Sequence, residues 1–249
     1  MTTIYLYSFA SVIVVSLISL VGVFTLSLKE KFMRKYIFVF ISVAVGALLG
    51  DAFIHLIPEA FEISNNQILT SIFIIAGIFF FFSLEKFLHW HHHGEDEGET
   101  SVHPMGKLLL VSDGVHNFID GVVIGASFLV SVPVGIATSI AVILHEIPQE
   151  IGDFAVLMHS GYSKGRALFL NFLSGIFSVF GLVFLFTIQN VSEIAEFVFL
   201  PLAAGGFIYI ALADLIPELH KTKEVRHSLL QLFSVIVGVL FMVGLLWLE

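Results

Sequence analysis

Cysteine is absent from the 249 residues of this sequence. That absence excludes disulfide bonds and removes thiolates from any metal-binding set. Charge is scarce as well, because Asp, Glu, Lys and Arg together make up only 12% of the chain. An average soluble domain carries about 25% charged residues, so the composition does not fit the soluble globular class.

Apolar residues take the place of the missing charge. They make up 57% of the chain, with 27 Phe, and the mean hydropathy is +1.00. Apolar stretches of about 20 or more residues recur, each long enough to cross roughly 30 Å of hydrocarbon as a helix. The stretches are too long and too uniformly apolar for the roughly ten-residue alternating strands of a barrel. Since only helices and closed barrels satisfy their backbone in lipid, the sequence predicts an all-α integral membrane protein.

Eight transmembrane helices are predicted, over residues 4–28, 36–60, 67–88, 105–131, 133–158, 163–188, 193–219 and 228–248. The first run has no basic segment before it and exceeds the length of a signal-peptide core. We therefore expect a true span there rather than a cleaved leader. Residues 1–249 are expected to form a single transmembrane domain, with a loop rich in His and acids at 89–104.

The basic residues predict the orientation of these spans. All 11 Lys and Arg residues lie in or beside alternate connections, those that follow spans one, three, five and seven. The other connections, at 61–66, 131–133 and 189–192, contain none. Cytoplasmic loops carry an excess of Lys and Arg, so the basic connections are expected to be cytoplasmic. With an even number of spans, the sequence predicts a multi-pass protein of the cell membrane whose two termini are both non-cytoplasmic.

A short internal repeat relates the two ends of the chain. The tetrapeptide L-I-P-E occurs at 56–59 and again at 215–218, and the same offset relates Gly46 to Gly205. Spans one to three would then echo spans six to eight. Because spans two and seven run in opposite directions, the copies predict a 3+2+3 arrangement with inverted repeats, which is common in transporters. Chance is the alternative for so short a match in a chain rich in Ile and Leu.

The predicted spans contain acids that no Lys or Arg accompanies. They are Asp51, Glu59, Asp113, Asp120, Glu146, Glu150, Asp153, Asp214 and Glu218. One ionised side chain at a helix centre costs about 2.5 to 3.5 kcal/mol on insertion scales, so several cost on the order of 10 kcal/mol. Protons or a bound metal ion would offset that charge. Histidines among the acids favour a metal, because imidazole is a good ligand for zinc and its neighbours.

Two adjoining spans carry most of this chemistry. Span four has polar residues at i, i+3, i+4 and i+7, which form one helix face: Asp113, His116, Asn117 and Asp120. Span five has a stripe of His145, Glu146, Gln149, Glu150 and Asp153. Two such helices facing each other offer four to six nitrogen and oxygen ligands. The alternative is a helix interface held by interhelical hydrogen bonds.

Residues 112–121, S-D-G-V-H-N-F-I-D-G, and 145–153, H-E-I-P-Q-E-I-G-D, resemble the two signature helices of the ZIP (Zrt/Irt-like) metal transporters. The resemblance is to the subfamily marked by H-E-x-P-H-E, and it extends to the eight-span plan and the His-rich loop. It implies uptake of metal into the cytoplasm, a homodimer, and a transport site of His116, Asn117, Asp120, His145, Glu146, Gln149 and Glu150. Gln149 stands where the subfamily has a second His, so selectivity for zinc over iron or manganese depends on this position.

The expected function is therefore transport of divalent metal ions, zinc first, with Fe²⁺, Mn²⁺ and Cd²⁺ as further candidates. The expected partners are these ions and the lipid bilayer, with no nucleic acid. Polar residues along the metal path would be Asp113, Asp153, Asp51, His55, Glu59, Asp214 and Glu218, for the last five of which helix-end polarity is the alternative. Loop residues His89, His91, His92 and His93 predict metal capture, with a solvated loop as the alternative.

Two other functions compete with this hypothesis. A membrane-embedded zinc hydrolase would use metal-bound water as the nucleophile. The pair His145-Glu146 resembles the start of the metal-binding motif of such enzymes. The metalloprotease motif needs a second His at i+4, however, and position 149 is Gln, so we do not expect an enzyme. A proton-coupled carrier or channel without tight metal binding is the other alternative.

Overall fold

The computed structural model describes residues 2–21, 30–64, 66–90, 103–188, 191–221 and 224–248. Within these ranges the chain is nearly all helical and contains no strand. Eight helices in the described ranges are long and apolar enough to cross a membrane: Thr3–Val21, Ile37–Ile63, Gln67–Leu84, Leu109–Val130, Val132–His159, Lys164–Phe186, Val191–His220 and Val225–Leu245. The prediction of an all-α membrane protein with eight spans is confirmed.

Several spans consist of consecutive helical segments. In chain order the elements are α1 (Thr2–Ile18), η1 (Ser19–Val21), α3 (Glu30–Gly50), η2 (Asp51–Leu56), α4 (Ile57–Ile63), α5 (Gln67–Trp90), α6 (His103–Val130), α7 (Val132–His159), α8 (Lys164–Gly175), α9 (Phe177–Phe186), α10 (Val191–Ile194), η3 (Ala195–Phe199), α11 (Leu200–Tyr209), η4 (Ile210–Leu215), α12 (Ile216–His220), α13 (Val225–Leu245) and η5 (Leu246–Leu248). Segments η2, η3 and η4 are π-helical turns inside longer helices.

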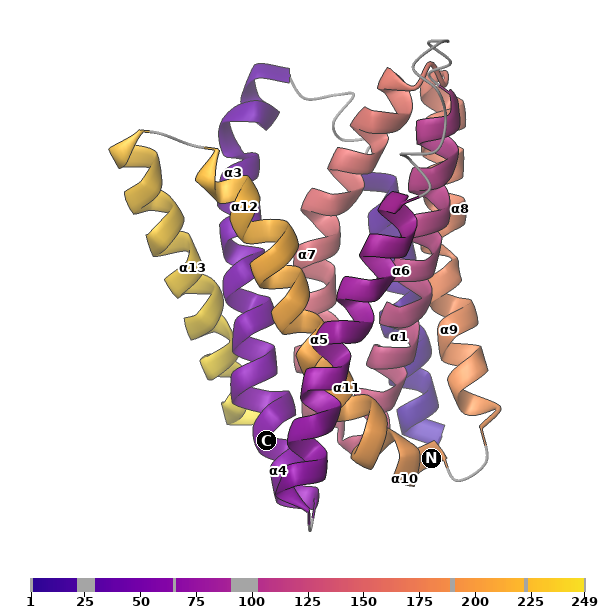
Figure 1. Cartoon of the computed structure of the whole chain (residues 1–249), viewed down its shortest axis with the longest axis vertical. Coiled ribbons are helices and arrows are strands. Elements are labelled where there is room, and N and C mark those ends of the chain that lie inside the picture. The colour runs from indigo at the N-terminus through magenta and orange to yellow at the C-terminus, as the bar shows by residue number, and fades with distance from the viewer. Residues whose placement is uncertain are drawn as a thin grey trace.

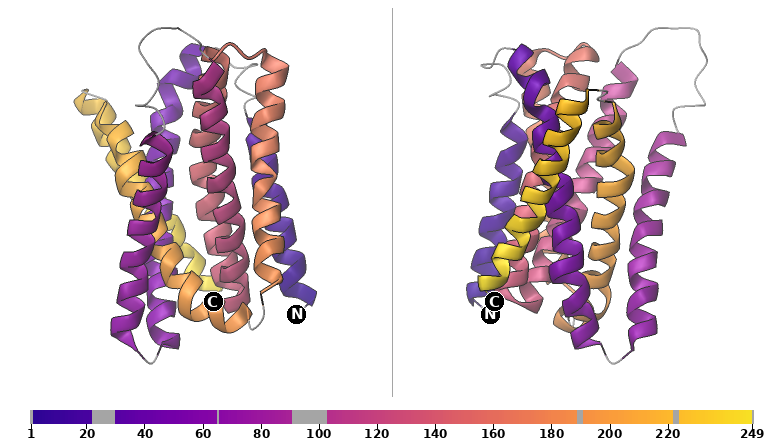
Figure 2. Two further views of the ribbon diagram at one scale, coloured as in Figure 1. Left: turned by 45° about the vertical axis from the view of Figure 1, so that its right-hand side comes forward. Right: turned by 90° about the vertical axis from the view of Figure 1, so that its left-hand side faces the viewer.

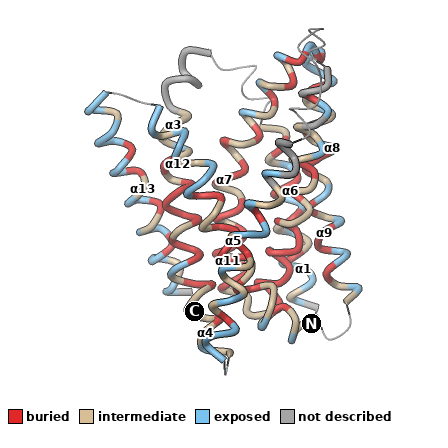
Figure 3. The backbone as a smooth tube through the Cα atoms, viewed as in Figure 1, coloured by how far each residue is buried: buried red, intermediate tan, exposed pale blue. Residues whose placement is uncertain are grey.

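Helices α6 and α7 form the centre of the bundle, and both termini lie at one end of it (Figure 1). The two central helices run antiparallel and lie side by side, with α5 and α13 at the periphery (Figure 2). In the spans of α6 and α7, 56% of the residues are buried, against 17% for α5 and 22% for α13. Buried positions accordingly gather along the central helices (Figure 3). Most polar residues in the middle of these two helices are accordingly buried: Asp113, Asn117, Asp120, His145, Glu146 and Glu150.

Helix α6 packs against α9 with almost no side chain between the two backbones. A Cβ atom added at Gly121 would collide with the backbone oxygen of Ser178, and one added at Gly181 would collide with that of Phe118. Small residues permit this close approach, which is a common way for helices to associate in membranes. The contact holds α6 in place on the side away from the periphery formed by α5 and α13.

The repeated tetrapeptide marks a repeated distortion of the backbone. The π-helical turn η2 ends just before the first I-P-E, and η4 ends just before the second. Proline has no amide hydrogen and crowds the carbonyl four residues earlier, so a widened turn before it relieves the clash. In addition, the Ser16 hydroxyl bonds the carbonyl of Gly175, 159 residues away, which is the offset between the two tetrapeptides. These features are consistent with duplication, while the inverted arrangement of the repeats stays a prediction.

Candidate metal centre

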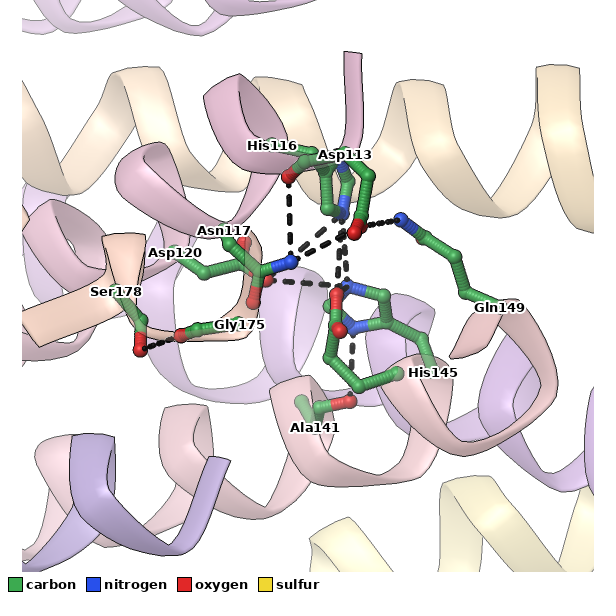
Figure 4. A network of polar contacts seen from close by, with 10 residues as sticks. Asp113, His116, Asn117, Asp120, Ala141, His145, Gln149, Gly175 and Ser178 are labelled. Carbon is green, nitrogen blue, oxygen red and sulfur yellow. Dashed lines mark hydrogen bonds and ion pairs between the residues drawn. The ribbon is translucent and has the colours of Figure 1, made fainter. Parts of the chain in front are cut away.

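Four side chains meet near the middle of the two central helices. His116 and Asp120 lie one turn apart on α6, and His145 faces them from α7 (Figure 4). Glu146 directly follows His145 on α7. Each offers one ligand atom, and these four atoms all lie within 4.8 Å of one another. Asp120, His145 and Glu146 are fully buried, and the side chain of His116 is 14% exposed. We call these four residues the His/carboxylate cluster.

The distances within the cluster match those around a tetrahedral metal ion. The two Nε2 atoms of His116 and His145 are 3.2 Å apart, and each lies 3.5 Å from Oε1 of Glu146. Oδ2 of Asp120 lies 3.5 Å from Nε2 of His145 and 3.8 Å from Nε2 of His116. Zinc bonds to nitrogen and oxygen at about 2.0 to 2.2 Å, which separates tetrahedral ligands by about 3.3 to 3.6 Å. The four atoms are therefore already spaced to surround one ion.

A hydrogen bond to the backbone of α7 orients the ring of His145 as a metal ligand would be oriented. Nδ1 of His145 lies 3.1 Å from the carbonyl oxygen of Ala141, one turn earlier. A carbonyl can only accept a hydrogen bond, so Nδ1 carries the proton of the neutral ring and Nε2 keeps its lone pair. Nε2 is the atom that faces the cluster. A hydrogen bond from the far nitrogen is the usual way in which proteins orient a metal-binding His.

The charge of the cluster suits a divalent cation. Both carboxylate oxygens of Asp120 and of Glu146 are buried without a hydrogen-bond partner. Among the described residues, the cluster acids make no ion pair with Lys or Arg, and the basic groups beside them are the two histidines. Two carboxylates and two neutral imidazoles sum to −2, so one divalent ion makes the site neutral. An uncompensated buried charge costs several kcal/mol, which favours a bound cation.

Aromatic rings close the cluster on the side of α5 and α11. The ring of Phe81, on α5, lies 6.4 Å from that of His116 in an edge-on arrangement. The ring of Phe207, on α11, lies 6.2 Å from that of His145 in a similar arrangement. Apolar walls lower the local dielectric constant and strengthen the attraction between a cation and its carboxylates.

Three of the seven predicted ligands lie outside this cluster. The amide of Asn117 donates to Oδ1 of Asp113 at 3.0 Å, and the amide of Gln149 approaches the same oxygen at 3.4 Å. Glu150 accepts a hydrogen bond from Asn171 on α8. The structure thus brings His116, Asp120, His145 and Glu146 together, while Asn117 and Gln149 contact Asp113 and Glu150 contacts Asn171. Their part in metal binding stays a prediction.

The predicted path residues separate into two groups. Asp51 and His55 are buried in η2, with Nε2 of His55 3.1 Å from the carbonyl oxygen of Met242, and Glu59 is partly buried one turn later in α4. Asp214 and Glu218, in η4 and α12, are exposed.

In the exposed group, the position of Glu218 has a local explanation. Glu218 pairs with Lys221 one turn later, at the end of α12. For Glu218, the pairing favours the helix-end alternative over a place on the metal path.

The loop histidines are not all within the described ranges. His91, His92 and His93 lie outside the described residues, and His89 is placed only as a backbone position near the end of α5. Capture of metal by this loop stays a prediction.

Asn171 is the residue whose role the sequence did not reveal. It is fully buried in α8 and contacts Glu150 through both a side-chain and a backbone oxygen. The only signal in the sequence is its position at i−3 and i−7 from Ser174 and Ser178, which gives the otherwise apolar span six one polar face.

Comparisons with known proteins show which proteins this chain resembles. The family model described as "ZIP Zinc transporter" matches residues 2–108 and 91–246. The chain is 36% identical over 219 residues to zinc transporter ZIP13 of Pongo abelii, an alignment that covers 82% of this chain and 65% of the relative. It is 32% identical over 289 residues to metal cation symporter ZIP14 of Xenopus tropicalis, with 88% of this chain and 62% of that protein covered. The chain thus spans somewhat less than two thirds of the length of these two relatives.

Proposed function

Because this chain belongs to the ZIP zinc transporter family, we propose that it carries divalent metal ions across a membrane through the His/carboxylate cluster. The observation that carries the proposal is the cluster itself: two imidazoles and two carboxylates whose ligand atoms all lie within 4.8 Å of one another in the centre of an eight-span bundle. Members of this family are transporters, so the hydrolase alternative is excluded.

Zinc is the proposed first substrate. Two nitrogen and two oxygen donors in a tetrahedral spacing suit zinc, which has no geometric preference of its own and binds both donor types. The same donors also accept iron, manganese and cadmium with other affinities. Since Gln149 adds no imidazole, discrimination between these ions rests mainly on His116 and His145.

The cluster supports a simple account of transport. A hydrated ion exchanges its waters for the four ligands, and the neutral complex that results is stable in surroundings of low dielectric constant. Release follows when a movement of α6 and α7 relative to the other helices opens the cluster to the opposite side, as transporters with central sites do. We propose uptake into the cytoplasm on the basis of the family resemblance, while the arrangement of basic residues indicates only which side is cytoplasmic.

Zinc flux into proteoliposomes tests this function. Purified chain is reconstituted around a zinc-sensitive dye, and His145→Ala and Asp120→Ala are compared with wild type. Both variants are expected to lose at least about 90% of the flux, because each removes a ligand. His227→Ala, a histidine at the start of α13 beside Glu224, is the matched control and should transport normally.

Folding of each variant is checked by its elution on size exclusion and by its melting temperature. Absence of flux for zinc, iron, manganese and cadmium with the wild-type protein would refute metal transport. Unchanged flux in both cluster variants would refute the cluster as the transport site. Proton-dependent flux of another solute without metal would favour the proton-coupled carrier.

A further inference from the structure

Basic side chains gather where α6 and α8 begin, at the end of the bundle opposite the two chain termini (Figure 1). Lys107 lies near the start of α6, and Lys164 and Arg166 lie in the first turn of α8; all three are exposed. The guanidinium carbon of Arg166 lies 5.5 Å from the centre of the Tyr162 ring. A Cβ atom added at Gly106 would lie 2.7 Å from a carbon of the same ring. The two helix starts are therefore neighbours, and we call Lys107, Lys164 and Arg166 the basic patch.

Acids of the described chain do not neutralise this patch. None of its three residues forms an ion pair with a described Asp or Glu, whereas Lys221, at the same end of the bundle, pairs with Glu218. Positive charges that lie close together repel one another. An anion placed between them would replace this repulsion by attraction, and phosphate groups are anions that Lys and Arg bind through charge and hydrogen bonds.

Exposed apolar side chains continue the patch towards the middle of the bundle. On α8, Phe169 and Leu173 follow Arg166 by three and seven residues, so the three share one face, and the two apolar residues are 61% and 44% exposed. On α6, Val111 lies one turn after Lys107 and is 58% exposed. A helix rises by about 1.5 Å per residue, so the stretch from Arg166 to Leu173 covers roughly 10 Å. That length is most of one leaflet, since the whole hydrocarbon core is about 30 Å thick.

The exposed faces of α6 and α8 belong to one continuous surface. Gly114, seven residues after Lys107 on α6, approaches Phe177, the first residue of α9 after α8: a Cβ atom added at Gly114 would lie 3.8 Å from the Phe177 ring. The two helices thus stay adjacent below the patch. A positively charged end above a shared apolar surface matches both parts of an anionic phospholipid.

We propose that the basic patch binds the headgroup of one anionic phospholipid, whose acyl chains lie along the exposed apolar faces of α6 and α8. The proposal does not depend on the transport function proposed above. Under the predicted orientation the patch faces the cytoplasmic leaflet, where anionic lipids attract basic side chains beside the membrane. A free phosphate ion would use the charges of the patch and leave the apolar faces unused, so the structure favours a lipid.

The general rule for basic residues explains the sign of the charge at this end and does not require a site. Lys221 and Arg226 satisfy that rule equally, because both are exposed at the same end of the bundle, on α12 and α13. If lipid responded only to the total charge, removal of these two residues and removal of two patch residues would have the same effect. A specific site predicts that only the patch matters.

Native mass spectrometry tests the site. Full-length protein in detergent is titrated with phosphatidylglycerol or with phosphatidylcholine, which has no net charge. We expect one phosphatidylglycerol per chain, bound at least tenfold more tightly than phosphatidylcholine. Lys107→Gln/Arg166→Gln should weaken this binding at least fivefold. The matched control Lys221→Gln/Arg226→Gln removes the same charge from the same end and should bind as the wild type does.

Two further measurements distinguish a lipid from an anion alone. Inorganic phosphate at the same concentration as the lipid should not displace phosphatidylglycerol, because it lacks acyl chains. Phe169→Ala, an exposed position below the patch, should weaken phosphatidylglycerol binding about threefold. All replaced side chains are exposed, so the variants are expected to keep the wild-type melting temperature in phosphatidylcholine nanodiscs. Equal losses in the two double variants, equal binding of the two lipids, or displacement by phosphate would each overturn the proposal.

Discussion

Asp120 and Glu146 illustrate how single residues decide the charge of the metal centre. Both carboxylates are buried without a hydrogen-bond partner in the described chain, and the basic groups beside them are two histidines. Under the proposed function, the protein would select its substrate by charge at this scale: two negative charges fit one divalent cation, and a monovalent ion would leave one charge uncompensated.

Replacement of Asp120 by Asn tests the charge balance without a change of size. The neutral amide leaves a divalent ion with a net charge of +1 in a buried site. Loss of one partner from a buried charge pair costs about 3 to 5 kcal/mol, so zinc affinity should fall by at least about 100-fold. A competitive titration with a fluorescent zinc chelator measures the change. Glu62→Gln, an exposed acid on α4, should keep the wild-type affinity, and an equal loss in that control would contradict the reasoning.

Gln149 is the residue expected to adjust metal preference. It lies one turn after His145 on α7 and directs its amide to Asp113. With Gln149→His an imidazole stands beside the cluster, which should raise the preference for zinc over manganese about 3- to 10-fold, because imidazole favours zinc more than oxygen ligands do. The measurement is competitive flux of the two ions.

Gln149→Leu separates this effect from the loss of the hydrogen bond to Asp113. The leucine has a similar size and offers no donor, so it should lower flux of both ions without a change in preference. A shift towards zinc in the leucine variant would show that the imidazole is not the cause.

At the scale of the elements, the metal centre depends on how closely α6 is held. The backbones of α6 and α9 approach each other at Gly121 and Gly181, and any side chain there would meet backbone atoms that cannot move aside. On the opposite side, α7 faces α6 with the histidines and acids. The tetrahedral spacing of the cluster thus follows from helix packing on both sides of α6.

Gly121→Ala tests this packing. The added methyl group would collide with the backbone oxygen of Ser178, so we expect destabilisation by about 1 to 3 kcal/mol, as for other overpacked sites. Gly152→Ala, at a mid-helix position in α7 with no atom within 4 Å of the new Cβ, should instead stabilise by up to about 1 kcal/mol through helix propensity. Melting temperatures of the two variants in detergent measure the difference. Equal melting temperatures would argue against close backbone packing at α6 and α9.

At the scale of the whole molecule, the open question is which end of the bundle faces the cytoplasm. Both termini lie at one end (Figure 1), and the basic connections belong to the other. The absence of cysteine makes the question simple to test, because any introduced thiol is the only one present. The homodimer implied by the family resemblance also belongs to this scale and stays a prediction.

Accessibility of two introduced cysteines decides the orientation. Gln67→Cys lies at the start of α5, and Ser163→Cys precedes α8 at the opposite end; both positions are exposed. In intact cells a membrane-impermeant maleimide should label Gln67→Cys and should label Ser163→Cys only after permeabilisation. The reverse pattern would place both termini in the cytoplasm, against the rule for basic residues.

Hydrophobic length and the helical spacing of polar residues were sufficient to predict eight spans and the two helices that carry the candidate site. These properties are local, since an apolar run of about 20 residues forms a helix in lipid whatever its neighbours are. The family also follows from a short stretch on each of two helices. The sequence by itself therefore determined the fold class, the central helices and seven candidate ligands.

Which of those ligands meet was decided only by the tertiary structure. Spacing along one helix shows which residues share a face, but the distance between Asp120 and His145 depends on the rotation and register of α6 against α7. The same packing turns Gln149 towards Asp113 and brings Asn171 to Glu150, from a helix that the sequence presented as almost wholly apolar. Contacts between helices depend on how whole surfaces fit together, and no single segment contains that information.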